Sequence, residues 1–305
     1  MWDLLFENKL MNIIPEERIF RDEPMYKHTT FRVGGPAKAY VSVNGHKELK
    51  EVLAICKESD VNVYIIGNGS NLLVSDQGFD GVIIEIGSNM RDISLEACRI
   101  TAAAGVLLSS LAAFALKNSL TGLEFAAGIP GTVGGAMVMN AGAYGGEMKD
   151  VVKRVCVFIP DTEEVKWISV SEMDFAYRHS VVREKGYIVL AAEFELSQGD
   201  EAAIKSVMDE LAAKRRDKQP LEYPSAGSTF KRPEGYFAGK LIEDSNLKGY
   251  AVGGAQVSNK HAGFVVNKGN ATASDIHSLI CDVRQKVMAD AGVELEPEVI
   301  MLGDF

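Results

Sequence analysis

The chain has 305 residues, of which 47% are hydrophobic and 24% charged, and its formal net charge is −10 at pH 7. This composition is ordinary for a globular enzyme of roughly two or three domains. The negative charge argues against general nucleic-acid binding, because only local basic patches could offset phosphate repulsion. Neither a signal peptide nor an apolar run of membrane-spanning length is recognisable, so we expect a cytoplasmic protein with no membrane partner.

Taken along the chain, the spacing of apolar residues predicts four helices with an apolar stripe on one face. They lie around residues 49–56, 107–115, 204–212 and 276–287. The last is expected to open at Thr272-Ala-Ser-Asp275 and to stop at Gly292. The first segment, residues 1–23, also resembles one or two helices.

Strand-like runs lie between these helices. They cover residues 61–66, 82–86, 151–159, 187–196, 263–266 and 299–302. Because helices and strands do not alternate strictly, we predict an α+β fold with mixed α/β layers. Domain boundaries are expected near residues 87–91 and within 215–227, where a polar, proline-bearing loop follows a long helix.

Four cysteines are widely spaced and form no C-x-x-C pair: Cys56, Cys98, Cys156 and Cys281. Their simplest interpretation is a set of core thiols in a reducing compartment. No spacing of histidines, cysteines and carboxylates indicates a metal, so we predict no metal site.

The most informative stretch, residues 123–147, is rich in glycine and carries no charge between Glu124 and Glu147. Its glycines and Pro130 would break any apolar helix, which excludes a membrane span. Glycine permits positive φ and a close approach of backbone to ligand, and bare N–H groups in such a loop bind anions. We interpret this stretch as the cradle of a dinucleotide cofactor.

A second glycine loop, G-N-G-S-N at 67–71, lies between two apolar strands. It is not the Rossmann fingerprint, because Leu72 replaces the third glycine and a strand follows in place of a helix. By itself it is more typical of a tight turn, but together with residues 128–135 it favours ligand binding. The segment 235–241 resembles a P-loop only superficially, since Leu241 stands where Ser or Thr must hold magnesium.

Three polar residues lie in settings that suit catalysis. Ser228 follows Gly227 and could relay a proton, although a serine in an ordinary turn is the favoured alternative on local evidence. Arg178, beside Tyr177, could hold a carboxylate bidentately or be a surface cation. Glu298 enters an apolar strand, where a carboxylate is costly unless paired, and the functional and structural interpretations are equally supported.

A basic cluster at residues 214–220 closes the third helix. It could complement the helix dipole or grip a diphosphate. Among the histidines, His261 is suggestive because Lys260 and Asn267 flank it, whereas His28, His46 and His277 match no motif.

Together and in this order, the motifs resemble the UDP-N-acetylenolpyruvoylglucosamine reductase (MurB) family of peptidoglycan synthesis. Each piece is weak alone, but the ordered set covers nearly the whole chain. The matching pieces are T-F-R-V-G-G-P-A at 30–37, G-N-G-S-N-L-L-V at 67–74, G-I-P-G-T-V-G-G at 128–135, N-A-G-A-Y-G at 140–145, Y-R-H-S at 177–180, A-G-S-T-F-K at 226–231, A-G-K-L-I at 238–242, G-G-A-Q-V at 253–257 and L-E-P-E-V at 295–299.

The resemblance implies a non-covalent FAD in a two-lobed domain of the vanillyl-alcohol-oxidase/PCMH type, and a C-terminal α/β domain for the substrate. The lobes would cover residues 1–88, to which a strand at 299–305 can return, and 89–218, and the substrate domain 219–298. Backbone amides of the two glycine loops would hold the FAD diphosphate. The cofactor-binding residues would be Gly67, Asn68, Gly69, Ser70, Asn71, Gly128, Ile129, Pro130, Gly131, Thr132, Gly134, Gly135, Asn140, Ala141, Gly142, Gly145 and Arg215.

The resemblance also implies two half-reactions. NADPH reduces FAD and leaves as NADP, and UDP-N-acetylglucosamine enolpyruvate then receives hydride from flavin N5 at its vinyl carbon, giving UDP-N-acetylmuramate. Ser228 would donate the proton, Arg178 would hold the carboxylate and the developing enolate, and Glu298 would orient or protonate the enol. The substrate-binding residues would be Tyr177, Lys218, Arg232 and His261.

The chain departs from the family pattern in three ways. Arg232 stands where Asn is frequent, His261 stands where the longer branch has Gln, and the tyrosine-bearing insertion of that branch is missing. The chain therefore resembles the shorter type II branch, and we expect a monomer. Another flavoenzyme, such as a small-alcohol oxidase, and a non-catalytic nucleotide sensor are the alternatives, although the set of Ser228, Arg178 and Glu298 argues against a sensor.

Overall fold

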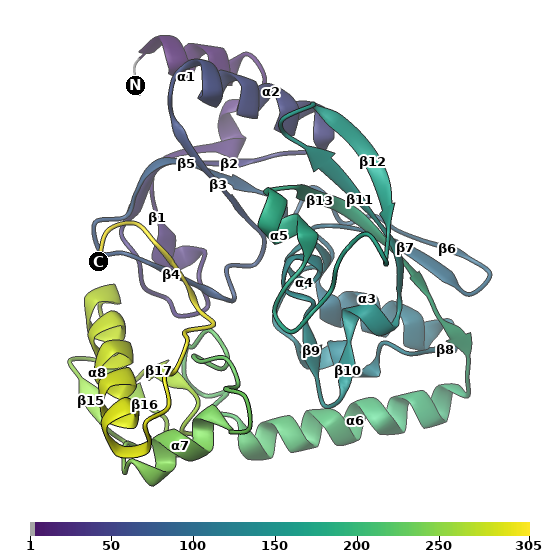
Figure 1. Cartoon of the computed structure of the whole chain (residues 1–305). Coiled ribbons are helices and arrows are strands. Elements are labelled where there is room, and N and C mark those ends of the chain that lie inside the picture. Colours follow the sequence, from purple (N-terminus) through teal and green to yellow (C-terminus); the bar gives the residue numbers. More distant parts are fainter. Residues whose placement is uncertain (1–3) are drawn as a thin grey trace. The chain divides into compact units, whose positions relative to one another are not determined.

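A computed structural model describes residues 4–305 of the chain (Figure 1). Helices and strands are mixed along the sequence, which confirms the predicted α+β class. The chain forms two compact units, each assembled from separate segments. The first unit comprises residues 4–21, 39–68 and 81–215, and the second comprises residues 22–38, 69–80 and 216–305.

The first unit contains a five-stranded antiparallel sheet of order β12-β11-β13-β7-β6. Its central strands carry buried apolar side chains, as in the register that pairs Val155 with Ala192. The strands are β6 (Ile93–Glu96), β7 (Arg99–Ala103), β11 (Val152–Ile159), β12 (Glu164–Ser169) and β13 (Ile188–Glu195).

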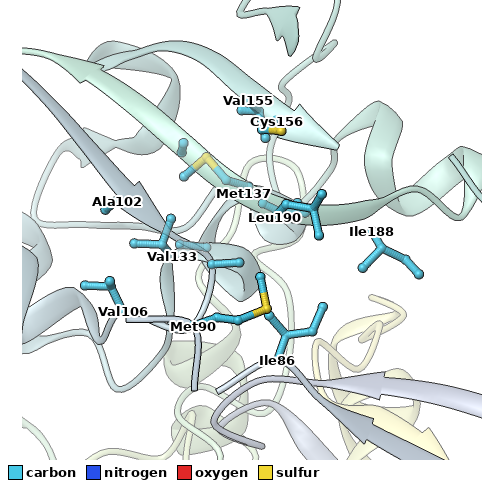
Figure 2. Close-up of a cluster of buried hydrophobic side chains, with 14 of the residues drawn as sticks. Ile86, Met90, Ala102, Val106, Val133, Met137, Val155, Cys156, Ile188 and Leu190 are labelled. Carbon is cyan, nitrogen blue, oxygen red and sulfur yellow. The ribbon is translucent and has the colours of Figure 1, made fainter. Parts of the chain in front are cut away.

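The core of the first unit lies between this sheet and the glycine-rich region. Figure 2 shows its centre, where side chains from the strands meet Val133 and Met137 of α4 (Val133–Met139). The stretch that seemed most like a cofactor loop therefore also supplies core residues. Further elements here are α3 (Leu108–Lys117), α5 (Val181–Lys185), β8 (Leu120–Thr121), β9 (Gly142–Ala143), β10 (Gly146–Glu147), β14 (Ser197–Gln198), and the short 3₁₀ turns η3 (Glu124–Gly128) and η4 (Met148–Asp150).

A four-stranded sheet has the order β1-β2-β5-β3. It consists of β1 (Ile19–Pro24), β2 (Pro36–Ser42), β3 (Asn62–Ile66) and β5 (Phe79–Glu85), and β3 pairs with β5 in parallel. The helices α1 (Leu4–Met11) and α2 (His46–Glu58) belong to the first unit, and a 3₁₀ turn η1 (Glu16–Arg18) precedes β1. The prediction of helix throughout residues 1–23 was wrong beyond residue 18, because Ile19 and its neighbours form an edge strand; residues 1–3 lie outside the described part.

The second unit packs two helices on small sheets. Its elements are the turn η2 (Met25–Lys27), α7 (Ala238–Asp244), α8 (Ala273–Ala291), the antiparallel sheet β15 (Ala251–Val252), β16 (Ala255–Val257) and β17 (Val265–Asn267), and the parallel pair β4 (Leu72–Val74) and β18 (Ile300–Leu302). The core here includes Ile276, Leu279, Ile280 and Val283 of α8, each fully buried.

The ends of α8 are set by its sequence. Thr272 and Asp275 form a capping box, and Gly292 ends the helix with φ of 65°, as predicted. Asp76 adds a second cap, because its carboxylate accepts hydrogen bonds from the Ala273 and Ser274 amides at 2.8 Å each. Burial opposes ionisation of Asp76, but the hydrogen bonds from Ser274 and Ala273 outweigh it and lower the pKa of the carboxyl group.

The predicted helices at 49–56, 107–115, 204–212 and 276–287 are confirmed as α2, α3, α6 (Glu201–Lys218) and α8. The apolar stripe of α6 is mostly not a core face, since only Ile204 is buried and Val207 is exposed. The predicted strands are all present, shifted by up to three residues. A boundary falls between residues 215 and 216, whereas residues 87–91 lie within the first unit; the finer division into two FAD lobes stays a prediction.

Two further expectations concern thiols and membranes. Cys56 and Cys156 are buried and Cys98 and Cys281 half-buried, all as free thiols. Burial raises the pKa of Cys56 to about 12, so this thiol is inert at neutral pH.

Within residues 4–305, no helix combines the length and the apolar character that crossing a membrane requires.

Candidate active site

The loop at residues 67–71 follows β3, and both of its glycines lie close to other segments of the chain. A methyl group at Gly67 would lie 2.5 Å from Thr132 Oγ1, within the first unit. Gly69 has φ of +58°, and a methyl group there would lie 1.9 Å from the carbonyl oxygen of His28, within the second unit. A side chain at Gly69 would force the backbone to move, whereas a side chain at Gly67 would require the Thr132 side chain to shift.

The amides of this loop have no acceptor among residues 4–305. None of the five N–H groups from residue 67 to residue 71 donates to an atom of the described residues. Gly69 is buried, and the other four residues are exposed or half-buried. Five consecutive donors without a protein acceptor are available to an anionic ligand.

The loop at residues 128–135 differs, because it uses its amides to build itself. Val133 N donates to Val106 O and Gly134 N to Ala104 O, each at 2.8 Å. Ile129 N donates to Ala126 O, and Gly131 N donates to Ile129 O. Gly135 N donates to Thr132 Oγ1 at 3.3 Å. From its sequence this loop is expected to present unpaired amides to a ligand, but most of its N–H groups already donate to acceptors within the chain.

Arg215 supplies the charge that this second loop lacks. The side chain lies against Gly128, where a methyl group would be 3.0 Å from the guanidinium Nη1. Burial lowers the pKa of Arg215, and Tyr144 partly offsets this effect. A half-buried cation against a glycine is a suitable partner for a diphosphate.

Asn140 is the left-handed C-cap of α4, with φ of 42°, and is almost fully buried. Its Nδ2 donates to Glu147 Oε2 at 2.8 Å and to the Ala176 carbonyl at 3.1 Å, and its Oδ1 accepts from Lys149 N at 3.0 Å. These bonds use the whole side-chain amide. The following residues Ala141, Gly142 and Gly145 are half-buried or exposed around the β9–β10 hairpin, where Gly145 has φ of +94°.

Arg178 lies at the tip of a tight turn in the first unit, closed by backbone bonds between Ala176 and His179. Its φ is +56°, an uncommon conformation for a non-glycine residue. The guanidinium lies 5.0 Å from the centre of the Tyr177 ring. Asn140 holds one end of the turn, and the buried Ser180 holds the other by donating to Val138 O at 2.8 Å.

Ser228 and Glu298, far apart in sequence, lie on neighbouring segments of the second unit. Glu298 N donates to Thr229 O at 2.8 Å, Lys231 N donates to Glu296 O at 2.9 Å, and a β-bridge joins the residues between. Ser228 is exposed and follows Gly227, whose φ is +77°. Thr229 is fully buried and fixes the turn by accepting from Val265 N at 2.9 Å.

Two of the predicted substrate-binding residues of the second unit, Lys218 and Arg232, are cations. Lys218 is the exposed last residue of α6, and Lys260 Nζ donates to the Arg216 carbonyl in the same turn at 2.6 Å. Arg232 is exposed, with its guanidinium 4.0 Å from the Phe237 ring centre. Tyr177, in the first unit, is likewise exposed.

His261 has a defined tautomer, since its Nδ1 accepts from Gly263 N at 3.1 Å and its Nε2 must then carry the proton of the neutral ring. Burial lowers the pKa of His261, and the neighbouring Lys248 and Lys218 lower it further. A neutral ring at pH 7 can donate one hydrogen bond from Nε2.

One group of potential metal ligands occurs among the described residues: Asp174, His179 and Glu184. His179 Nε2 lies 3.6 Å from Asp174 Oδ2 and 3.8 Å from Glu184 Oε2, which is ion-pair geometry at the surface. The sequence analysis did not single out this group or the tether Thr229, and it named Asn140 as a cofactor-binding residue without expecting its tethering bonds. The burial of Thr229 beside an exposed serine has no sequence signature.

Comparisons with known proteins cover both units. The family profile described as "UDP-N-acetylenolpyruvoylglucosamine reductase, C-terminal domain" matches residues 219–302, and that described as "FAD binding domain" matches residues 37–167. The UDP-N-acetylenolpyruvoylglucosamine reductase of Agathobacter rectalis is 53% identical over 98% of this chain and 99% of its own. That of Clostridioides difficile is 52% identical over 97% of each chain.

A solved structure agrees. The UDP-N-acetylenolpyruvylglucosamine reductase (MurB) of Thermus caldophilus has a TM-score of 0.80 and 35% identity, covering 92% of this chain and 97% of that chain. Both glycine loops lie in the part matched by the FAD-binding profile, and Ser228 and Glu298 lie in the part matched by the C-terminal profile. The chain therefore belongs to the UDP-N-acetylenolpyruvoylglucosamine reductase (MurB) family of FAD-dependent oxidoreductases.

Proposed function

We propose that this chain reduces UDP-N-acetylglucosamine enolpyruvate to UDP-N-acetylmuramate, using FAD and NADPH, in the synthesis of peptidoglycan precursors. The observation that carries the proposal is the pairing of the Ser228 and Glu298 segments, because it places residues with a hydroxyl and a carboxylate, far apart in the sequence, on neighbouring segments. The family relationship and the unpaired amides of residues 67–71 support the cofactor.

The residues present fit a non-covalent FAD. The five unpaired amides of residues 67–71 would bind the diphosphate, and Arg215 would neutralise it. The glycine-rich residues 128–135 and 140–145 would lie against the cofactor, chiefly as a close-fitting wall, since most amides of the former already have acceptors. When bound, FAD supplies to the vinyl carbon a hydride that originates from NADPH.

The chain's own residues would manage charge and protons. Reduction of the vinyl carbon leaves negative charge at the carbon that bears the carboxylate, and Arg178 would stabilise it electrostatically. Ser228, exposed on a turn fixed by Thr229, would donate a proton to that carbon, and Glu298 would orient or protonate the enol beside it.

The UDP part of the substrate would bind the second unit. Lys218 and Arg232 would contact the diphosphate and uridine, and His261 would donate one hydrogen bond from Nε2. Tyr177 would accompany Arg178 at the carboxylate. A monomer of the shorter type II branch would contain all of these groups, with residues 219–298 as the substrate domain.

Anaerobic spectroscopy tests the proposal. The purified protein should show a flavin spectrum that NADPH bleaches and that recovers only when UDP-N-acetylglucosamine enolpyruvate is added. Ser228→Ala should keep the bleaching step and lose recovery by roughly 100-fold or more, a general acid's usual contribution. Fast recovery with oxygen, unaffected by the UDP substrate, would instead favour an oxidase, and normal turnover of Ser228→Ala would refute the role of this residue.

A further inference from the structure

Glu298 is held in place by its backbone, through bonds from two sides within the second unit. Glu298 N donates to Thr229 O at 2.8 Å, and the Glu298 carbonyl accepts from Asn71 Nδ2 at 2.9 Å. Pro297, the preceding residue, has no N–H to contribute. The bonds to Glu298 N and Glu298 O hold the peptide groups on either side of its side chain. Two more backbone bonds flank them, from Lys231 N to Glu296 O and from Ile300 N to Asn71 O.

Asn71 divides its backbone and side chain between two tasks. Its N–H belongs to the unpaired amides of residues 67–71, whereas its carbonyl accepts from Ile300 N at 2.9 Å and its side-chain amide donates to Glu298 O. The parallel pairing of β4 with β18 starts at the next residue, Leu72 with Ile300. The side chain of this motif asparagine is thus hydrogen-bonded to Glu298 itself, two residues before β18 begins.

We infer that Asn71 is a positioning residue, whose side-chain amide fixes the segment before β18 that presents Glu298 to the substrate. The inference rests on the role proposed above for Glu298. An error of about 1 Å in the placement of a catalytic group can cost on the order of 100-fold in rate. Without the amide, the Glu298 carbonyl loses its hydrogen bond from Asn71.

The test separates cofactor binding from substrate reduction. Asn71→Ala removes the amide without adding charge near a diphosphate. The bound flavin per polypeptide and the rate of bleaching by NADPH should change by less than about twofold, while anaerobic reoxidation by UDP-N-acetylglucosamine enolpyruvate should slow roughly 10- to 100-fold. Asn71→Ser, which keeps a shorter donor, should give a smaller loss and serves if Asn71→Ala folds poorly.

A matched control is Asn267→Ala. Asn267 is a buried asparagine of the same unit whose Nδ2 donates to a carbonyl, that of Phe31, at 3.1 Å. Its loss should destabilise the unit at least as much, because Oδ1 also accepts two amides, yet reoxidation should stay near wild type. Equal slowing in both variants would overturn the inference in favour of general loosening.

A double-mutant cycle with Glu298→Gln provides the decisive readout. If Asn71 acts through Glu298, adding Asn71→Ala to Glu298→Gln should slow reoxidation by less than about twofold more. Additive losses, or loss of flavin with normal reoxidation of the flavin that remains, would overturn the inference and make Asn71 a cofactor ligand. Wild-type protein whose flavin is not reoxidised by the UDP substrate would refute the proposed function itself, before any variant is compared.

Discussion

The two glycine loops are similar in composition but differ in what their backbones do. Residues 67–71 leave five consecutive amides without an acceptor, whereas residues 128–135 give most of theirs to carbonyls of residues 104, 106, 126 and 129. The first loop is suited to bind an anion by its backbone, and the second is a rigid wall to which Arg215 adds the charge. Glycine content alone therefore does not separate a loop with available amides from one whose amides are already bonded; the hydrogen bonds of each amide do.

The largest effect should come from Gly69→Ala. The new methyl group would lie 1.9 Å from the His28 carbonyl, so the loop must move and several amide contacts to a diphosphate are lost together. We expect FAD affinity to fall roughly 100-fold or more, at about 1.5–3 kcal/mol per charged hydrogen bond. The flavin absorbance per polypeptide that remains after gel filtration measures the loss of FAD affinity.

The control for this variant is Gly292→Ala. Gly292 has a similar φ of +65°, but a methyl group there meets no atom within 4 Å. It should lose about 0.5–1 kcal/mol of stability and keep its flavin. Full flavin retention by Gly69→Ala would show that the amides of residues 67–71 are not the phosphate site.

Arg215→Ala should have the next largest effect. Removing the guanidinium beside Gly128 should weaken FAD binding roughly 10- to 100-fold, the worth of one charged hydrogen bond. Titration of the apoprotein with FAD, followed by fluorescence quenching, measures it. Arg216→Ala, at the neighbouring exposed position, provides the comparison. An equal loss of FAD affinity in both variants would show that only the net charge of the protein matters.

A smaller effect tests the second loop as a wall. Thr132→Val removes the hydroxyl that accepts from Gly135 N and contacts Gly67, and should cost about 1–2 kcal/mol of unfolding free energy with partial loss of flavin. Thr272→Val removes the equivalent cap of α8 and should cost a similar amount without loss of flavin. Urea unfolding, with flavin content recorded in parallel, distinguishes the two. Equal flavin loss in Thr132→Val and Thr272→Val would show that residues 128–135 have no specific role in binding the flavin.

The smallest effect concerns the strand after the first loop. Asp76, which lies beyond β4, caps α8, and Asp76→Asn should cost about 0.5–1 kcal/mol at pH 7, the low end for a cap because the residue is exposed. The folded-state pKa of Asp76 is lowered, so its contribution is complete above the unfolded-state pKa of about 3.9 and disappears as the pH falls through the lower folded value. Urea unfolding of both proteins against pH should show the difference shrinking only in acid. A difference that persists in acid would exclude the charge as its cause.

Local patterns predicted most elements, because capping and apolar periodicity act over a few residues. The capping box at Thr272 and the left-handed Gly292 are examples. The same reasoning failed at residues 19–24, whose strand depends on pairing in a sheet, and for the exposed Val207 stripe of α6. Resemblance to a family, carried by ordered motifs, identified the chemistry where single motifs could not.

The sequence by itself determined the class of fold, the family, the reaction to expect and the glycine positions that the backbone requires. Only the tertiary structure decided how the motif residues are used. It joined the Ser228 turn to the Glu298 segment and engaged the side chains of Asn71 and Asn140 in hydrogen bonds within the chain. It also left the amides of residues 67–71 without an acceptor among residues 4–305. The reason is physical: a donor or acceptor has no fixed partner in the sequence, and its partner is chosen only when distant segments pack together.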